Sequence, residues 1–151
     1  MKILKIDTNK KRYMDLLLLA DEQENMIDAY LERGTLYALE TDSKIDETIA
    51  VCVVTDESDG VLEIKNIAVK PSDQRMGYGK ALIDFIVDEY KNTYRVLQVG
   101  TGDVPEATAF YEKCGFKKSH KIENFFTDNY NLPMYESGIQ LIDMIYFTLN
   151  L

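Results

Sequence analysis

Apolar residues recur along this chain at two spacings, which predict where its helices and strands lie. Residues 2–7 alternate polar and apolar side chains as a strand does, and Thr8 then offers an N-cap for a helix. The apolar residues of that helix recur at helical spacing: Tyr13, Leu16, Leu17 and Ala20. A second helix is predicted over residues 22–32, with Gly34 just beyond its end, where a left-handed C-cap is expected.

The middle of the chain changes to the pattern of β-strands. Three β-rich runs, residues 36–40, 48–55 and 61–69, are separated by TDSKID and DESDG, which are dense in turn-forming residues. The pattern predicts three antiparallel strands in a meander. Helical spacing returns over residues 77–90, and Asn92 is expected to end that helix. A strand is then predicted at residues 94–100. The strand of residues 61–69, the helix and the strand of residues 94–100 are joined by short connections. They are therefore predicted to form a right-handed parallel βαβ unit.

The last third of the chain contains one more helix and two more strands. Pro105 suits a first helical turn, and that helix is expected to stop at Gly115. Strands are predicted at residues 116–122 and 139–149, on either side of the irregular aromatic segment NFFTDNYNLPMYESG. The order β-α-α-β-β-β-α-β-α-β-β predicts a mixed α/β (α+β) fold in a single domain over residues 1–151, without a linker or repeat.

Composition narrows the classes of function. With 151 residues, 46% of them hydrophobic, the chain has enough apolar surface for one core. The net charge of −9 disfavours nucleic acid as a partner, and it suits either a cationic ligand or simple solubility. No apolar run has the length of a membrane span or leader, so the protein is expected to be cytoplasmic. Cys52 and Cys114 are expected to be buried thiols rather than a disulfide, and no metal site is predicted.

A pair of glycines stands where the strand of residues 61–69 gives way to the next helix, in VKPSDQRMGYGKAL. The first turn of a helix presents unpaired N–H groups and a partial positive charge, so a glycine-rich entry suits an anion. The Rossmann pattern requires a third glycine where Leu82 stands, and the Walker A pattern requires Ser or Thr where Ala81 stands. The joint therefore predicts a phosphate site of another type, with plain turn chemistry as the alternative.

Two motifs resemble the GNAT superfamily of N-acetyltransferases. The stretch IAVKPSDQRMGYGKAL resembles the family's acetyl-CoA loop at these positions: Val69, Pro71, Gln74, Gly77 and Gly79. Residues 106–116, EATAFYEKCGF, look like its A-x-x-Φ-Y-x-x-x-G-F stretch, where Φ is apolar. The resemblance implies a splayed, mostly antiparallel seven-stranded mixed sheet with helices on both faces.

The resemblance also implies which residues bind acetyl-CoA. Backbone N–H groups from Arg75 to Lys80 would hold the diphosphate, and the strand edge at residues 67–69 would pair with the pantetheine arm and polarise the thioester. The family's pantetheine-binding Asn is replaced by Val104, so Thr101 or Asp103 is expected to substitute. The expected cosubstrate-binding residues are therefore Ile67, Ala68, Val69, Gln74, Arg75, Met76, Gly77, Tyr78, Gly79, Lys80 and Thr101.

Two residues are candidates for proton transfer. Glu63 occupies the position of a base in some family members, and strand alternation places it on one face with Lys65 and Ile67. Its alternatives are a solvated carboxylate without a catalytic role, or a water chain as the base. Tyr111 matches the family's general acid for the leaving thiolate, against the alternative of an ordinary core tyrosine. The single histidine, His120, is expected at the surface.

The resemblance implies direct transfer of an acetyl group from acetyl-CoA to a primary amine in a ternary complex, without a metal. The acidic balance favours a small cationic amine as the acceptor. A peptide or protein amine and a non-catalytic acyl-CoA sensor remain alternatives, and the sequence leaves open whether the protein forms a homodimer. Four aromatic residues of the irregular segment either wall an acceptor pocket or cover the sheet: Phe125, Phe126, Tyr130 and Tyr135.

Overall fold

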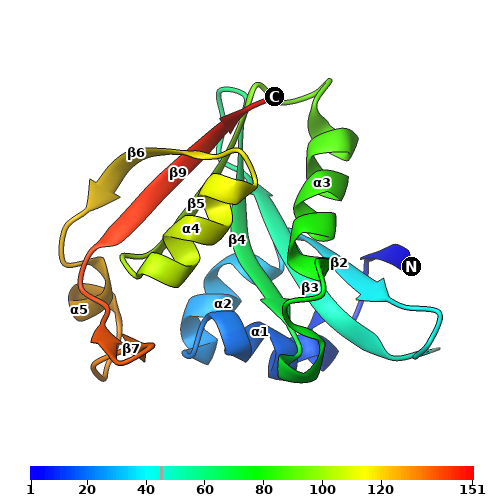
Figure 1. Ribbon diagram of the computed structural model, residues 1–151, viewed down its shortest axis with the longest axis horizontal. Helices are drawn as coiled ribbons and strands as arrows, with labels where there is room; N and C mark the ends of the chain where they lie inside the picture. Colours follow the sequence, from blue (N-terminus) through cyan, green and yellow to red (C-terminus); the bar gives the residue numbers. More distant parts are fainter. Residues whose placement is uncertain (45) are drawn as a thin grey trace.

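A seven-stranded mixed sheet organises the molecule in a computed structural model that describes residues 1–44 and 46–151 (Figure 1). The strand order is β1-β2-β3-β4-β5-β9-β6, and every neighbouring pair is antiparallel except β4 and β5. The predicted meander and parallel crossover are both confirmed. The bounds of the strands are β1 (Lys2–Ile6), β2 (Thr35–Glu40), β3 (Thr48–Asp56), β4 (Val61–Val69), β5 (Val96–Gly102), β6 (Lys117–Ile122) and β9 (Met144–Asn150).

Helices cover both faces of this sheet, as the sequence predicted. One face packs on α1 and α2 through a core that includes Leu17 and Ile27, and the other packs on α3 and α4. Successive residues of β3 divide between the two cores, because strand side chains alternate between faces. The helices are α1 (Met14–Ala20), α2 (Glu24–Leu31), α3 (Tyr78–Tyr90), α4 (Pro105–Lys113) and α5 (Phe125–Asn129). In the described part of the chain, none is long and apolar enough to cross a membrane.

Two predicted helix ends are wrong. A 3-10 turn, η1 (Lys10–Tyr13), precedes α1 and begins after Asn9, without the expected cap from Thr8. Helix α2 ends at Leu31, its C-cap Glu32 is right-handed, and Gly34 lacks the positive φ of a left-handed cap. Gly34 is small for a different reason, because a Cβ there would lie 2.7 Å from Val53 Cγ1.

Lys10 terminates α2 in place of the glycine. Its ammonium donates hydrogen bonds to the carbonyls of Leu31 (3.2 Å), Glu32 (3.2 Å) and Gly34 (2.7 Å). A lysine near a helix C-terminus satisfies orphan carbonyls and opposes the helix dipole. We expect Lys10→Met to lower the free energy of unfolding by about 1–2 kcal/mol, measured by urea denaturation. The control Lys11→Met removes only the exposed pair with Asp28 (3.2 Å), and an equal loss in both variants would contradict this role.

Strands β4 and β5 diverge half-way along their length (Figure 1). Their parallel pairing ends at Ile64 and Val99, although β4 continues to Val69 and β5 to Gly102. The register of β3 against β4 shifts at the same level, which leaves Lys65 as an extra residue in β4. Such a bulge bends the strand and increases its twist. The sheet therefore opens into a fork between β4 and β5, with Ile64 at its base.

The aromatic segment forms a small unit of its own. It contains α5 and a two-stranded hairpin, β7 (Tyr135–Glu136) with β8 (Ile139–Gln140), so the closing strand begins at Met144 instead of residue 139. Phe126 packs with Val104 and Leu141 in a third apolar cluster, which Phe125 and Tyr130 adjoin. Most of these aromatic residues therefore build a core, while Tyr135 stays exposed.

Candidate functional site

The glycine joint folds into a loop that leads from β4 to α3, here named the cradle (residues 74–80). A 3-10 turn, η2 (Pro71–Asp73), precedes it, and Gly77 is the N-cap of α3 with φ 88°. A Cβ on Gly77 would meet nothing within 4 Å, so this glycine serves the backbone conformation. A Cβ on Gly79 would lie 3.1 Å from Phe110 Cζ, so this glycine permits α3 to approach α4. The two glycines therefore serve different purposes, backbone conformation at Gly77 and close helix packing at Gly79.

Most backbone N–H groups of the cradle have no partner in the described residues. The N–H groups of residues 75–80 have no hydrogen-bond acceptor among the residues that the structure describes, and Ala81 is the first to bond, to the Gly77 carbonyl at 3.0 Å. No side chain caps this end of α3. Consecutive free N–H groups at a helix N-terminus form an anion site, because the donors and the helix dipole act in the same direction.

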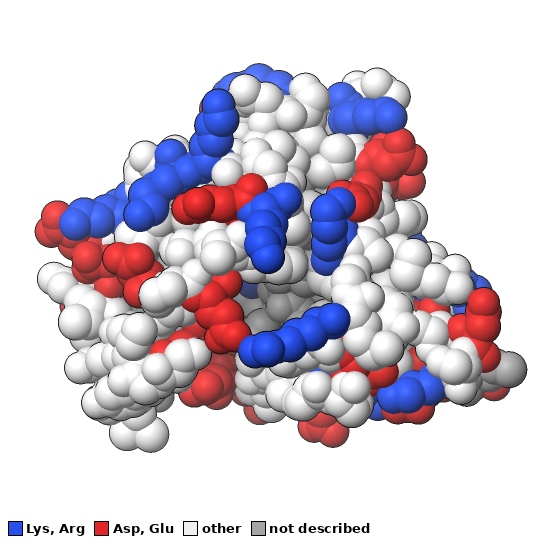
Figure 2. Space-filling model, in the orientation of Figure 1, with Lys and Arg blue, Asp and Glu red and all other residues white. Residues whose placement is uncertain are grey.

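Two cationic side chains of the cradle form exposed ion pairs. Arg75 lies 3.4 Å from Glu106 and Lys80 lies 2.9 Å from Asp84, with all four side chains more than half exposed. Exposed pairs of this kind contribute little stability, so the cations remain available to a ligand. Figure 2 shows a hollow on this face, between α4 and the start of α3, with basic side chains above and below it and acidic ones along one side.

The other cradle side chains have distinct surroundings. Gln74 donates to the Val69 carbonyl at 3.0 Å and so ties the loop back to β4. Met76 is exposed, and Tyr78 packs against the larger core. Gln74 therefore shapes the loop through its side chain.

Beyond the fork, β4 pairs with no strand of the described residues on the side that faces β5, and the Gln74 side chain reaches this edge at the Val69 carbonyl. Lys70 N–H donates to the Ile49 carbonyl, and alternation along an antiparallel ladder then directs the backbone groups of Ile67 and Val69 away from β3. Those groups point into the fork. Ala68 instead faces the core under α1 and α2, and Thr101 lies on β5 beyond the base of the fork.

Tyr111 lies on α4 in the core of the α3 face. Its ring centroid is 5.7 Å from that of Phe116 and 6.0 Å from that of Phe147, and 7% of the residue is exposed. Its hydroxyl has no hydrogen-bond partner in the described residues. Burial raises the pKa of Tyr111, with smaller contributions from nearby groups that include Cys52 and Glu136. The phenol therefore keeps its proton at neutral pH.

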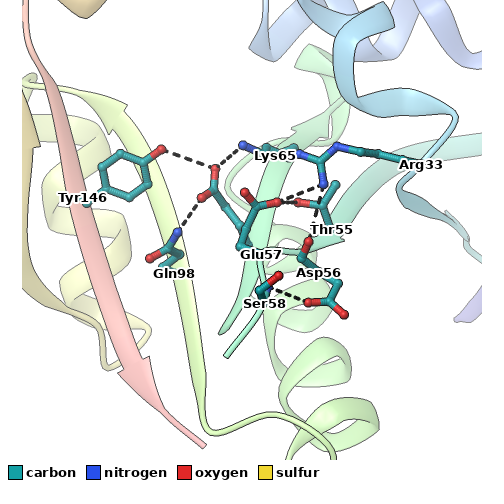
Figure 3. Close-up of polar contacts among 9 residues, drawn as sticks. Arg33, Thr55, Asp56, Glu57, Ser58, Lys65, Gln98 and Tyr146 are labelled. Carbon is teal, nitrogen blue, oxygen red and sulfur yellow. Dashed lines mark hydrogen bonds and ion pairs between the residues drawn. The ribbon is translucent and has the colours of Figure 1, made fainter. Parts of the chain in front are cut away.

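Glu63 lies on the opposite face of the sheet from Ile67, so the predicted shared face is wrong. The bulge at Lys65 inserts one residue, which reverses the alternation between them. The Glu63 carboxylate is buried and bonds three side chains (Figure 3): Gln98 Nε2 at 2.6 Å, Lys65 Nζ at 2.8 Å and Tyr146 Oη at 3.4 Å. Glu63 pairs in register with Gln98, one residue before the base of the fork.

A family model described as an acetyltransferase (GNAT) domain matches residues 32–118 of this chain. The chain belongs to the GNAT acetyltransferase family. An uncharacterized N-acetyltransferase of Bacillus subtilis (strain 168), YvbK, is 39% identical over 147 residues, 96% of this chain and 92% of its own.

Solved GNAT structures share the whole fold. An acetyltransferase from Elizabethkingia anophelis with acetyl-CoA bound has a TM-score of 0.91 and 36% identity, covering 99% of this chain and 97% of its own. A Bacillus subtilis acetyltransferase in complex with CoA has a TM-score of 0.88 and 36% identity, covering 99% and 98%. The splayed sheet is therefore the GNAT fold, and the protein is an acyltransferase of this family.

In this GNAT protein, two ion pairs join the residues just before the cradle to the β2–β3 hairpin. The motif did not reveal these pairs. Lys44 Nζ lies 3.0 Å from both carboxylate oxygens of buried Asp73, and Lys70 Nζ lies 2.6 Å from Glu47. The hydrogen bond from Lys44 lowers the pKa of Asp73. Because Asp73 directly precedes the cradle, this pair fixes where the free N–H groups point.

We expect Asp73→Asn to weaken acetyl-CoA binding about three- to tenfold, because the loop loses its charged anchor. Isothermal titration calorimetry measures this affinity. Asp88→Asn is the matched control, since it removes an ion pair of 2.9 Å with Lys91 at the far end of α3. Unchanged affinity in Asp73→Asn would show that the cradle holds its shape without the hairpin.

His120 is exposed, as expected, yet it is close to the Glu63 network of this GNAT protein. Its ring stacks on Tyr146 with centroids 4.7 Å apart and planes at 2°. Val104, which stands where the family carries Asn, is buried against Phe126 and Leu141. In the described residues there is no group of three side chains arranged to hold a metal ion.

Proposed function

We propose that this protein, as a single domain over residues 1–151, transfers an acetyl group from acetyl-CoA to a primary amine by direct attack in a ternary complex. One observation carries the proposal: the unpaired N–H groups of residues 75–80 follow a strand whose edge has no partner strand at Ile67 and Val69. Relatives with 36% identity bind acetyl-CoA or CoA in their crystal structures, which supports the same ligand here.

The cosubstrate has two kinds of contact in this proposal. Its diphosphate accepts hydrogen bonds from the cradle N–H groups, and Arg75 and Lys80 add positive charge. Its pantetheine amides extend β4 at Ile67 and Val69 as an added strand would. The net charge of −9 opposes an anionic ligand, but its effect is screened over a Debye length of about 8 Å, whereas the cradle contacts are direct.

In this proposal, the two proton-transfer residues act from opposite faces of the sheet. The acceptor ammonium gives one proton to Glu63, directly or through water, and its nitrogen then attacks the thioester carbonyl. A β4 backbone N–H stabilises the oxyanion. The C–N bond forms, the C–S bond breaks, and Tyr111 donates its proton to the leaving sulfur. The nitrogen then loses its second surplus proton, which passes through water to the Tyr111 oxygen and leaves the neutral amide. Glu63 and Tyr111 lie on opposite faces, and the fork between β4 and β5 connects the two.

A small cationic amine is the acceptor that the charges favour. Burial raises the pKa of Glu136, and the nearby carboxylates of Glu22 and Glu106 raise it further. These three acidic residues come from different segments, and Glu136 is also close enough to Tyr111 to raise the pKa of the phenol. A cation placed among them would relieve their mutual repulsion.

A thiol-release assay with acetyl-CoA and a panel of amines tests the proposal. We expect turnover with one or more polycationic small amines, and a rise in melting temperature with CoA alone. A melting shift without release for any amine, peptide amines included, would instead indicate a non-catalytic acyl-CoA sensor. No melting shift at all would overturn the cosubstrate assignment.

A further inference from the structure

Tyr146 is a buried phenol on β9 whose ring is held against two neighbouring strands. A Cβ on Gly100 of β5 would lie 3.0 Å from Tyr146 Cζ, so glycine at position 100 makes room for the ring. His120 stacks on the same ring from β6, where the register with β9 shifts between Lys118 and Lys121. The ring held in this way places its hydroxyl within reach of the Glu63 carboxylate.

The hydroxyl acts as a donor to Glu63. Burial and the negative charge of Glu63 raise the pKa of Tyr146, so the phenol keeps the proton that it donates. The distance of 3.4 Å is longer than an ordinary O–H···O bond, as catalytic contacts often are before substrate binds. Gln98 and Lys65 supply shorter bonds, and the carboxylate is thus held from β4, β5 and β9 at the base of the fork.

Both acidic and basic side chains lie around the Glu63 carboxylate. Burial alone would raise the pKa of Glu57, but the hydrogen bond from Thr55 and the positive charge of Lys65 lower it. Arg33 also pairs with Glu57 at 3.0 Å (Figure 3). In the described residues, the titratable and charged groups that act on Glu63 and Tyr146 are therefore Lys65, Glu57 and the stacked His120, while Arg33 pairs with Glu57.

We propose that Tyr146 is a positioning residue for acetyl transfer, which orients the Glu63 carboxylate toward the acceptor amine at the base of the fork. This inference rests on the proposed role of Glu63 as the base. A carboxylate held by one fewer donor rotates more freely, so it is less well aimed at the acceptor. The family motifs do not supply this residue, because it lies on the closing strand.

Tyr146→Phe tests the proposal, since it removes only the hydroxyl. We expect kcat to fall about 10- to 100-fold with the KM for acetyl-CoA unchanged. The matched control is Tyr37→Phe, which removes a buried hydroxyl bonded to Tyr90 at 2.7 Å on the other face. It should lose stability and keep the wild-type kcat.

A double-mutant cycle separates positioning from general stabilisation. In a Glu63→Gln background, Tyr146→Phe should have little further effect on kcat, because the phenol acts through Glu63. An undiminished second effect, or a kcat of the single variant within about threefold of the wild type, would overturn the inference. Full activity of Glu63→Gln would overturn the assigned base itself. If no amine is acetylated, carbon-13 NMR of labelled glutamate still decides, since the Glu63 carboxyl signal must change its chemical shift in Tyr146→Phe and keep it in Tyr37→Phe.

Discussion

Tyr111→Phe should lower kcat by about 10²-fold or more, while acetyl-CoA binds with nearly unchanged affinity. The expected loss is that of a general acid that protonates the departing thiolate as the C–S bond breaks. The ring would remain packed between Phe116 and Phe147, so the fold should tolerate the change. Steady-state thiol release gives kcat, and calorimetry gives the affinity for acetyl-CoA.

The protonation state of Tyr111 adds a pH criterion. Burial raises its pKa, and a raised pKa means that the proton stays on the phenol until the pH exceeds the ordinary value for tyrosine. Activity of the wild-type protein should therefore not decline between pH 7 and about 9 through loss of this proton. If Tyr111→Phe kept kcat within about threefold, Tyr111 would be a core residue without a role in the chemistry.

The strands and helices of the main sheet could be predicted because their signals are local. Alternation over residues 61–69 and helical spacing over residues 77–90 appear in the sequence, and the short crossover between them fixes a parallel pair. The helix ends that failed depend on distant partners. Gly34 is small because of Val53, and Lys10 replaces the expected cap by reaching across the chain to α2.

The same distinction applies to the site. The cradle is one continuous motif, so its place at the start of α3 could be predicted from the sequence. Glu63 could be chosen as a candidate, but its face could not be predicted, because nothing in LEIKNIAV marks Lys65 as the bulged residue. Its partners Gln98 and Tyr146 lie 35 and 83 residues away along the chain, so only the sheet brings them together.

Gly77→Ala should weaken acetyl-CoA binding at least about tenfold. An L-residue in the left-handed region costs about 1–2 kcal/mol, so the loop relaxes toward negative φ and the N–H groups of residues 75–80 turn away from a common point. The added methyl also enters the open space in front of Gly77, where the diphosphate is proposed to lie. Calorimetric titration with CoA and acetyl-CoA measures the loss.

Gly60→Ala is the control that separates strain from binding. Gly60 has φ 77°, similar to the 88° of Gly77, but it precedes β4, whereas the cradle follows that strand. The three atoms nearest to a Cβ there all belong to the side chain of Arg95, the closest at 3.0 Å. Both variants should lose comparable stability in urea, since both force alanine into the same backbone region. Only Gly77→Ala should lose affinity for acetyl-CoA. Equal affinity in the two variants would show that the N-terminus of α3 does not hold the cosubstrate.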